Sequence, residues 1–450
     1  MFDREIIKEL NKWAKRPNRK PLILRGARQV GKTTAVEIFS RQFEQYIYLN
    51  LDNQSERRIF QKGYDIDQLI QAIFLEKNRA ISSGKLLIFI DEIQNSPEAV
   101  SMLRYFYESK STRDYYVIAA GSLLESLISK NINIPVGRVE YLYMKPLSFR
   151  EYLNAVGNLS SFDVLKQMPF PDFAHEKLLK DFYQYTLIGG MPEVVETYNK
   201  HKEITGLRIV YESLLTSYLD DVEKYARNNT IANVIRHAIE NSFYSAANRI
   251  RFEGFGHSKY RSREMSEALK IIEKAMLIYL MYPTTTVKIP IEPDNKKSPR
   301  LHILDTGLIN YFAGLQKEMF GTRDLDSFYE GKIAEHIVGQ ELMAENQSII
   351  KKAGFWIREK KQSSAQVDYV IPFNNYLIPV EVKKGKAGRL RSLHEYMNRA
   401  PHNFAVRVYS GRLSIDNVKT TQGKKYFLLN LPFYLVGKID DYLDWFLQKI

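Results

Sequence analysis

Residues 26–33 have the spacing of a phosphate-binding loop, Gly-Ala-Arg-Gln-Val-Gly-Lys-Thr, and they follow an apolar stretch at residues 22–24. The two glycines let the backbone turn tightly enough for successive N–H groups to surround a β-phosphate. The lysine ammonium then reaches the β- and γ-oxygens, and the threonine hydroxyl ligates Mg²⁺. The pattern predicts an ATP–Mg²⁺ site at the N-terminus of a helix, which favours anions. The residues expected to contact nucleotide are Gly26, Ala27, Arg28, Gln29, Val30, Gly31, Lys32, Thr33 and Thr34.

A second, acidic element completes this chemistry. Residues 86–90 form an all-apolar run, typical of a strand buried on both faces, and the run ends in Asp91 and Glu92. We expect Asp91 to hold Mg²⁺ through water, and Glu92 to polarise the water that attacks the γ-phosphate. An acidic pair at a strand end is common by itself. Together with the upstream loop, it predicts ATP hydrolysis.

A third set of residues lies in the C-terminal part of the chain. Glu335 belongs to a helical pattern, Asp368 to a strand-like run at 366–371, and Glu381 and Lys383 to another at 377–383. The alternation of a strand places Glu381 and Lys383 on the same face. Asp368 and Glu381 can share Mg²⁺ or Mn²⁺ with help from Glu335, while Lys383 orients the water that attacks a phosphodiester.

This order of residues resembles the PD-(D/E)xK nuclease fold, including the resolvase-like enzymes. The fold also occurs as an inactive binding module, so both cutting and binding stay open. The basic residues that follow could hold a phosphate backbone; they are Lys384, Lys386, Arg389 and Arg391. His336, next to Glu335, is expected to be structural because the site is already rich in oxygen donors.

The elements that position the first site form an α/β pattern. We expect Asp3 to cap a helix that places Ile6, Ile7, Leu10 and Trp13 on one face. Strands are predicted at residues 22–25, 46–51, 86–90 and 116–120, separated by helical patterns, which favours a parallel sheet covered on both faces. Ser122 follows the last strand, where it either senses the γ-phosphate or belongs to an ordinary turn.

These motifs resemble the AAA+ superfamily, and more narrowly the bacterial and archaeal AAA-type ATPases that carry a C-terminal domain of unknown function. The resemblance covers nearly the whole chain. It rests on Arg25–Thr33, on Asp91-Glu92-Ile93-Gln94, on Gly121-Ser122 as a sensor strand, on Pro135–Arg138 and Pro146–Leu153 as the end of the core, on Gly189–Glu193 as a lid motif, and on Asp305–Leu308.

Two features of the resemblance leave alternatives open. Gly189 and Gly190 bring backbone close to a nucleotide, or they form a plain turn between helices. Arg138 either reaches the γ-phosphate of a neighbouring subunit, which would require a homo-oligomer, or is simply solvated or ion-paired.

Residues 206–285 have a helix-rich pattern with two apolar faces. One is formed by Ile231, Val234, Ile235, Ala238 and Ile239, and the other by Leu269, Ile272, Ala275 and Met276. A glycine turn, a basic helix and a β-like run at 284–289 are what a winged helix-turn-helix gives. Lys259, Arg261 and Arg263 contact DNA phosphates, or the segment serves only as a spacer. Residues 292–300 are expected to form a loop or linker.

Composition is consistent with this organisation. A length of 450 residues suggests about three domains, and a formal charge of +13 favours a polyanionic partner such as nucleic acid. Cysteine is absent, and no apolar stretch approaches the roughly 20 residues of a membrane span. We therefore expect a cytoplasmic protein with no membrane partner.

The sequence predicts an α/β protein with four parts. These are an AAA+ P-loop core at 1–145, a helical lid at 146–205, a winged-helix-like segment at 206–290 and a PD-(D/E)xK-like domain at 291–450. The leading hypothesis is an ATP-driven enzyme that acts on DNA. The alternative is a nucleotide-gated switch or assembly scaffold whose C-terminal domain only binds protein or nucleic acid.

Overall fold

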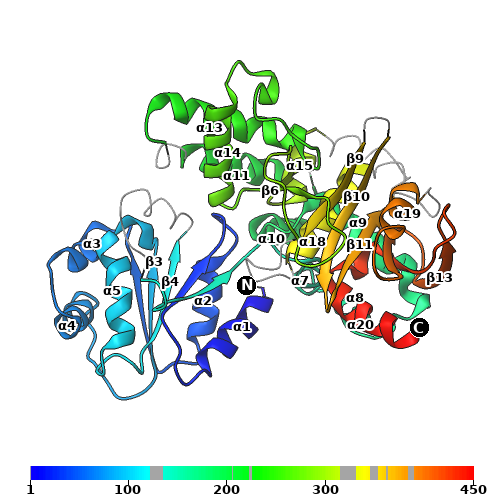
Figure 1. Ribbon diagram of the computed structural model, residues 1–450. Helices are drawn as coiled ribbons and strands as arrows, with labels where there is room; N and C mark the ends of the chain where they lie inside the picture. The colour runs from blue at the N-terminus through cyan, green and yellow to red at the C-terminus, as the bar shows by residue number, and fades with distance from the viewer. Residues whose placement is uncertain are drawn as a thin grey trace. The chain divides into compact units, whose positions relative to one another are not determined.

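The computed structural model describes residues 2–121, 135–204, 206–221, 226–314, 331–344, 353–360, 363–383 and 390–450 (Figure 1). The chain forms two compact units. Unit 1 comprises residues 1–145 with 274–276, and unit 2 comprises 146–273 with 277–450. Ser122, Lys384, Lys386 and Arg389 lie outside the described residues.

Unit 1 is built on a five-stranded parallel sheet in the order β2-β3-β4-β1-β5. The strands are β1 (Leu22–Arg25), β2 (Gln45–Asn50), β3 (Leu86–Asp91), β4 (Tyr116–Gly121) and β5 (Glu140–Tyr143). The four strands expected from the sequence are present, which confirms the parallel sheet. The sequence did not reveal β5, because this edge strand is only partly buried and lacks a continuous apolar run.

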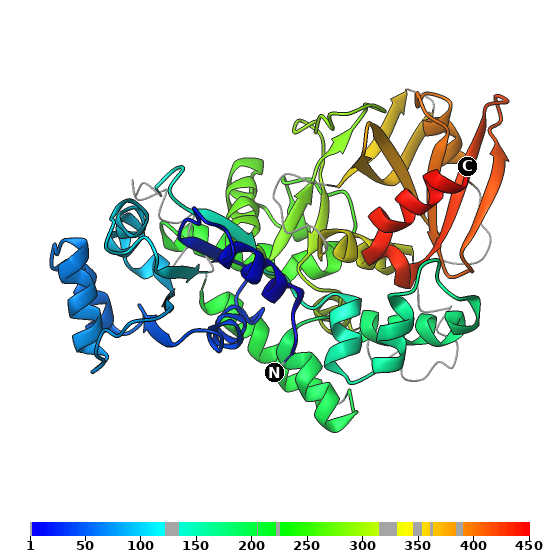
Figure 2. The same cartoon turned by 90° about the horizontal axis from the view of Figure 1, so that it is seen from below.

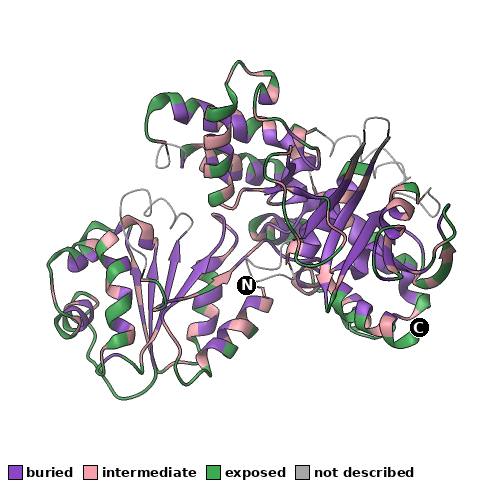
Figure 3. Ribbon diagram, viewed as in Figure 1, coloured by how far each residue is buried: buried purple, intermediate pink, exposed green. Residues whose placement is uncertain are grey.

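Helices cover both faces of this sheet (Figure 1). On one side lie α1 (Glu5–Ala14) and α2 (Lys32–Ser40), and on the other α3 (Gln54–Gln61), α4 (Ile66–Glu76) and α5 (Pro97–Glu108). Side chains of β3 are buried along its whole length, as expected for a strand between two helical layers. Figure 3 shows this burial at the centre of the sheet, with exposed residues on the outer helix faces.

The cap predicted for the first helix is wrong. Helix α1 begins at Glu5, its N-cap residue is Arg4, and no side-chain cap bond forms there. The side chain of Arg4 instead donates to the carbonyl oxygens of Val30 (3.1 Å) and Lys145 (2.6 Å). The predicted apolar face is present, with Ile6, Leu10 and Trp13 buried.

Unit 2 begins with a series of helices. They are α7 (Phe149–Ala155), α8 (Leu159–Leu165), α9 (His175–Ile188), α10 (Pro192–His201), α11 (Leu207–Asp220), α13 (Asn229–Ser242) and α14 (Ser262–Lys274). Both predicted apolar faces pack inward. The buried residues are Ile231, Val234, Ile235, Ala238 and Ile239 on α13, and Leu269 and Ile272 on α14.

The β-like run predicted at 284–289 is misplaced. The strand after α14 is β6 (Ile278–Met281), and it pairs antiparallel with β8 (Arg300–Ile303). Only Pro283 and Thr284, which form β7, pair further on, with β9 (Gly354–Lys360). Beyond them the hydroxyl of Thr286 bonds locally, accepting from the N–H of Lys288 at 3.2 Å. Such side-chain bonds compete with a strand ladder.

The C-terminal part of unit 2 is a mixed seven-stranded sheet in the order β13-β14-β12-β11-β10-β9-β7. Its further strands are β10 (Ser363–Phe373), β11 (Tyr376–Val382), β12 (Phe404–Tyr409), β13 (Ser414–Lys419) and β14 (Lys425–Pro432). The helices of this part are α15 (Thr306–Phe312), α18 (Gly331–Ala344), α19 (Arg391–Met397) and α20 (Ile439–Lys449). In both Figure 1 and Figure 2 α20 lies beside this sheet.

The glycine pair that resembles a lid motif is packed inside unit 2. Gly190 donates its N–H to Oδ2 of Asp305 at 2.6 Å, and its carbonyl accepts the N–H of Leu147 at 2.7 Å. A Cβ on Gly190 would lie 2.1 Å from the Leu147 carbonyl oxygen, and Gly189 has a φ of +73°. These glycines therefore allow close backbone packing around Asp305, and both polar groups of Gly190 are used within the unit.

None of the described helices is both long and apolar enough to span a bilayer.

Candidate functional site

The phosphate-binding loop connects strand β1 to helix α2, as the sequence predicts. Gly31 is the N-cap of α2 and has a φ of +94°. Glycine adopts this left-handed conformation without the steric cost that a side chain would bring. Gly26 is needed for a different reason, because a Cβ there would lie 2.5 Å from the carbonyl oxygen of Met144. Gln29, between them, also has a positive φ of +64°. The loop is thus held in a curved shape by its own backbone.

Lys32, the first residue of α2, is folded back into the loop. Its ammonium donates to the carbonyl oxygens of Gly26 and Ala27, both at 2.9 Å. Burial lowers the pKa of Lys32 to about 8, although the charges of Glu92 and Asp91 oppose that shift. Phosphate oxygens beside this side chain would favour its charged form. Of the other expected contacts, Val30 is buried, Arg28 is partly buried and Thr34 is exposed.

Thr33 and Asp91, the two residues expected near Mg²⁺, are in contact. The hydroxyl of Thr33 donates to Oδ2 of Asp91 at 2.6 Å, and the N–H of Glu92 donates to Oδ1 at 3.0 Å. A hydroxyl and a carboxylate are oxygen ligands of the type that Mg²⁺ uses when it is bound together with nucleotide phosphates. These residues therefore fit the expected ion.

Glu92 follows β3 in a left-handed conformation, with a φ of +51°. Burial raises the pKa of its carboxyl, and a hydrogen bond from the side-chain amide of Gln94 to Oε2 opposes the rise. A non-glycine residue held at positive φ is a form of strain that occurs often at functional sites. The geometry holds Glu92 in one orientation at the end of the central strand.

Gln94 is a contact that the chemical interpretation of the sequence missed. Its Oε1 lies 2.2 Å from the point where a Cβ on Gly121 would be, so the absence of a side chain at Gly121 makes room for it. The only signal in the sequence was the position of Gln94 two residues after Glu92 in the quoted acidic motif.

Arg138, the residue expected to act across a subunit boundary, is ion-paired within the chain. Its Nε lies 2.6 Å from Oε1 of Glu108, the last residue of α5, and its side chain is 43% exposed. Oxygens of Glu108 also accept from Arg104, which together with Arg138 lowers the pKa of this carboxyl. Exposed ion pairs of this kind contribute little to stability.

In unit 2 the structure brings together all four residues predicted from the C-terminal pattern. Asp368 lies on β10 and accepts the N–H of Val382 on the neighbouring strand β11 at 2.8 Å. Lys383, just after β11, lies 2.7 Å from Oε1 of Glu381. Glu335 approaches from α18, where burial and then the negative charge of Asp368 raise the pKa of its carboxyl. The predicted face shared by Glu381 and Lys383 is therefore present.

Arg300 is a further member of this group that the sequence did not reveal. It begins β8, its side chain is 1% exposed, and its guanidinium lies 3.6 Å from Oε2 of Glu335 and 3.7 Å from Oδ1 of Asp368. Nη1 also donates to the carbonyl oxygen of Asp368 at 2.8 Å. The sequence predicts a loop or linker at residues 292–300, and nothing in that pattern indicates that Arg300 at its end is buried.

Burial dominates the electrostatics of these acids. It raises the pKa of Glu335 to about 7 and that of Glu381 to about 8, and it raises the pKa of Asp368 as well. Neighbouring carboxylates add to the pKa shifts of both glutamates, Lys383 opposes both shifts, and Arg300 opposes that of Glu335. The group is thus a cluster of three acids and two cations in which Arg300, Asp368 and Glu381 are buried and the side chains of Glu335 and Lys383 are about a quarter exposed.

The cluster does not fit the metal site expected from the sequence. Within the parts of the chain that the structure describes, no group of three or more His, Asp or Glu side chains is arranged to hold a metal ion. One oxygen of each carboxylate faces a cation instead of an open metal position, because Arg300 lies 3.7 Å from Oδ1 of Asp368 and Lys383 lies 2.7 Å from Oε1 of Glu381.

His336 has a structural role, as predicted from the sequence. It is fully buried, its Nε2 accepts the N–H of Ile303 at 3.0 Å, and its Nδ1 lies 3.0 Å from the hydroxyl of Thr306. Burial lowers its pKa to about 3, so the ring is neutral. It fixes β8 and the start of α15 against α18.

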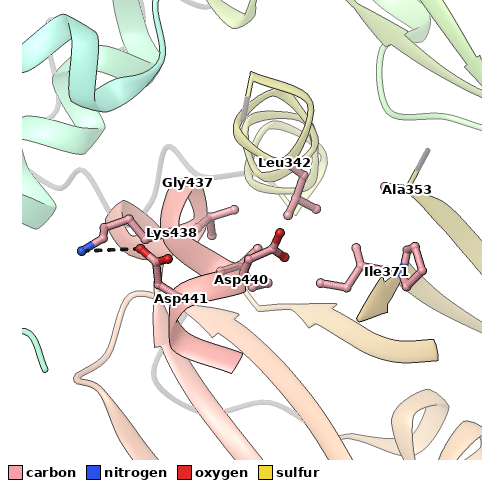
Figure 4. Close-up of a pocket in the computed structure, with 10 residues that line it drawn as sticks. Leu342, Ala353, Ile371, Gly437, Lys438, Asp440 and Asp441 are labelled. Carbon is pink, nitrogen blue, oxygen red and sulfur yellow. Dashed lines mark ion pairs between the residues drawn. The ribbon is translucent and has the colours of Figure 1, made fainter. Parts of the chain in front are cut away.

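A cavity of about 270 Å³ lies elsewhere in unit 2 (Figure 4). It is bordered by Leu342 at the end of α18, by Ile371 on β10, and by Lys438, Asp440 and Asp441 around the start of α20. No residue of the acidic cluster lines it.

Comparison with known families places the first site in a defined class. Residues 18–153 match the family model of an AAA domain, residues 179–319 match a domain of unknown function (DUF8612), and residues 330–432 match a second one (DUF4143). The chain therefore carries a P-loop ATPase domain of the AAA type, followed by two domains of unknown function. This confirms the predicted ATPase and the expected C-terminal domain of unknown function.

Several solved structures are similar at low identity. The Walker-type ATPase PABY2304 of Pyrococcus abyssi is 14% identical, with 70% of this chain and 96% of that chain covered and a TM-score of 0.45. The RuvB Holliday junction branch migration motor of Thermotoga maritima is 14% identical (62% and 90% covered, TM-score 0.29). The Aeropyrum pernix ORC1 protein, solved in complex with DNA, is 13% identical (71% and 93% covered, TM-score 0.31). These likenesses are too distant to carry a functional argument. A comparison with curated proteins found no match.

Proposed function

We propose that this AAA-type ATPase uses ATP hydrolysis to control how its second unit engages DNA. The observation that carries the proposal is the convergence of Glu335, Asp368, Glu381 and Lys383 at one place in unit 2. Along the chain these residues come from a helix, then a strand, then the end of a second strand, within the series of elements α18-β9-β10-β11-α19-β12. This order supports the resemblance to the PD-(D/E)xK fold, whose members act on or bind nucleic acid.

Basic side chains on the surface of unit 2 support a DNA partner. Arg251, Lys259, Arg261 and Arg263 are all exposed, in the loop before α14 and on the first turn of that helix. The helices α11, α13 and α14, followed by the antiparallel pair β6–β8, support a winged-helix-like arrangement of this segment. Such residues would bind phosphates without reading the base sequence.

The ATPase chemistry follows from unit 1. The loop N–H groups and Lys32 bind the phosphates, and Thr33 and Asp91 would hold Mg²⁺, which supplies charge neutralisation at the γ-phosphate. Glu92 in its ionised form accepts a proton from the attacking water. Gln94 keeps the carboxylate of Glu92 in place through its hydrogen bond. Ser122 and Arg138 are retained as proposed γ-phosphate contacts, with Arg138 supplied by a neighbouring copy in a homo-oligomer.

The second unit has two candidate roles, cutting and binding. The four converging residues favour a nuclease-like fold, and the presence of Lys383 beside the three acids supports the cutting role. The ion pairs of Arg300 and Lys383 favour the second role, in which the domain binds DNA or protein and ATP only gates it. We retain the four-part division at 145, 205 and 290 as part of this proposal.

Measurements on purified full-length protein test the proposal. We expect duplex DNA to bind with strong salt dependence and to change the rate of phosphate release from ATP. The double variant Arg261→Gln, Arg263→Gln should weaken binding at every sequence and flatten its salt dependence. Arg208→Gln is a matched control, because Arg208 is an exposed arginine of the same unit paired with Glu212.

Two results would overturn the DNA proposal. One is the absence of DNA binding at low salt in every nucleotide state. The other is binding that leaves the ATPase rate unchanged and that responds equally to the control and the double variant.

A further inference from the structure

We propose that Arg300 is a built-in cation of the C-terminal acidic cluster, and that its charge beside Glu335 and Asp368 keeps a divalent metal out of the cluster. The inference rests on the nuclease-like core of the proposed function and deepens it. In the folded wild-type protein the cluster then holds no metal. The second unit therefore has a binding role and not a cutting role.

The first step is the balance of charge. Three carboxylates, those of Glu335, Asp368 and Glu381, lie around the cluster, and two cations reach them. Arg300 is within 4 Å of Glu335 and Asp368, and Lys383 contacts Glu381. Buried carboxylates need such compensation, which is ordinarily the role of the ion in a metal site.

The second step is the depth of the arginine. Its side chain is 1% exposed, whereas arginine is rarely buried completely unless it is paired. The guanidinium carbon lies 4.8 Å from the ring centre of Phe355 on β9 and 5.6 Å from that of Tyr369 on β10. Two aromatic rings and the carbonyl oxygen of Asp368 thus hold the group in one position.

The third step concerns what anchors the backbone of Arg300. The residue pairs with Met281 across the β6–β8 ladder, and two residues further on His302 is buried beside His336. The N–H of Ile303 is bound by His336 of α18, the helix that also carries Glu335. Strand β8, and with it the backbone of Arg300, is therefore fixed to the helix that supplies one of the acids.

The fourth step is the state of the remaining polar atoms. Nη2 of Arg300 and Oε2 of Glu381 are both buried without a hydrogen-bond partner among the described residues. Arg300 therefore balances the charge of the acids without using all of its donors. A divalent ion entering the cluster would meet the guanidinium as a like charge at short range. It would bind only where that charge has been removed.

Manganese binding to the nucleotide-free full-length protein tests the inference. We expect wild type at millimolar metal to show no Mn²⁺ binding in titration calorimetry, and no rise in Tm with Mn²⁺, that Asp368→Asn removes. Arg300→Gln removes the charge but keeps a planar amide. It should bind about one Mn²⁺ and regain several degrees of Tm with the metal. The double variant Arg300→Gln, Asp368→Asn should lose that gain, and Arg208→Gln should behave as wild type.

Binding of Mn²⁺ by wild type that Asp368→Asn abolishes would overturn the inference. So would a folded Arg300→Gln protein that binds no metal. Because Arg300→Gln could fail to fold, the wild-type titration is decisive by itself, and Arg300→Lys offers a second variant that keeps the charge and should still exclude Mn²⁺.

DNA binding, measured on the same samples, separates this inference from the proposed function. If wild type binds both Mn²⁺ in this cluster and DNA, the role of Arg300 fails while the DNA proposal stands. If it binds neither, the DNA proposal fails and the role of Arg300 is supported.

Discussion

The hydroxyl of Thr33 donates a 2.6 Å hydrogen bond to the carboxylate of Asp91, although 58 positions separate the two residues. The start of α2 and the end of β3 therefore meet at one point of the parallel sheet, because the carboxyl ends of parallel strands lie at the same edge. Lys32 and Glu92 are their immediate neighbours in sequence. This contact joins the phosphate-binding half of the ATPase site to its hydrolytic half.

Substitutions at Lys32 and Glu92 should separate ATP binding from ATP hydrolysis. Lys32→Ala removes the charge that reaches the phosphates, so we expect ATP affinity to fall. Glu92→Gln keeps the shape and removes the base, so it should bind ATP normally and hydrolyse it roughly a hundredfold more slowly or worse. Nucleotide titration and phosphate release measure the two effects. Normal turnover by Glu92→Gln would rule out its assigned role.

Gln94 should control the pH dependence of ATP hydrolysis. Burial raises the pKa of Glu92, and the hydrogen bond from Gln94 stabilises the ionised form and limits that rise. A base works when ionised, so the rate should increase with pH as Glu92 loses its proton. In Gln94→Leu the pKa rises further, and the acid limb of the rate profile should move to higher pH.

The profile of kcat against pH measures this shift. Glu92→Gln is the control, since it should lack the limb altogether. An unshifted limb in a Gln94→Leu protein of unchanged thermal stability contradicts the positioning role of Gln94.

Arg138 is expected to act in trans, so that hydrolysis depends on assembly. Arg138→Ala keeps the ATP-binding loop but lacks the arginine that reaches the γ-phosphate of the neighbouring subunit. Lys32→Ala keeps that arginine but has a loop that no longer binds ATP. Each should be nearly inactive alone, and mixed oligomers should regain activity where an Arg138→Ala site receives Arg138 from its neighbour. Full activity of Arg138→Ala alone, or no recovery in oligomers shown to be mixed, would remove the proposal. Glu108→Gln should leave the recovery intact, because it only breaks the pair within the chain.

The sequence predicted most of what depends on local spacing. The loop at 26–33 and the acidic end of β3 follow from short patterns, and the shared face of Glu381 and Lys383 follows from strand alternation. Prediction failed where a partner lies far along the chain. Nothing near Arg300 indicates that its guanidinium reaches Glu335 and Asp368, and nothing near Asp3 shows that Arg4 is held by Val30 and Lys145 instead.

Gly190 is expected to be among the least replaceable residues of unit 2. In Gly190→Ala the new Cβ would lie 2.1 Å from the backbone oxygen of Leu147, and backbone cannot move aside as a flexible side chain can. We expect the free energy of unfolding to fall by about 3 kcal/mol or more, the scale of severe overpacking. Gly206→Ala is a matched control, because no atom of the described residues is recorded within 4 Å of a Cβ there and its φ is −70°. Equal stability of the two variants in denaturant unfolding would contradict the packing argument.

Asp368 decides between the two roles proposed for the second unit. If the unit cuts DNA with a metal, Asp368→Asn should abolish cutting and leave ATP turnover largely intact, since the two sites lie in separate units. If Arg300 fills the cluster, wild type should cut none of single-stranded, duplex or branched DNA with Mg²⁺ or Mn²⁺, with or without ATP. Because the charged pairs of Arg300 argue for the second outcome, we expect DNA to remain whole while it still binds. Metal-dependent cutting by wild type that Asp368→Asn eliminates would restore the nuclease role. It would also show that the guanidinium of Arg300 does not exclude the metal ion.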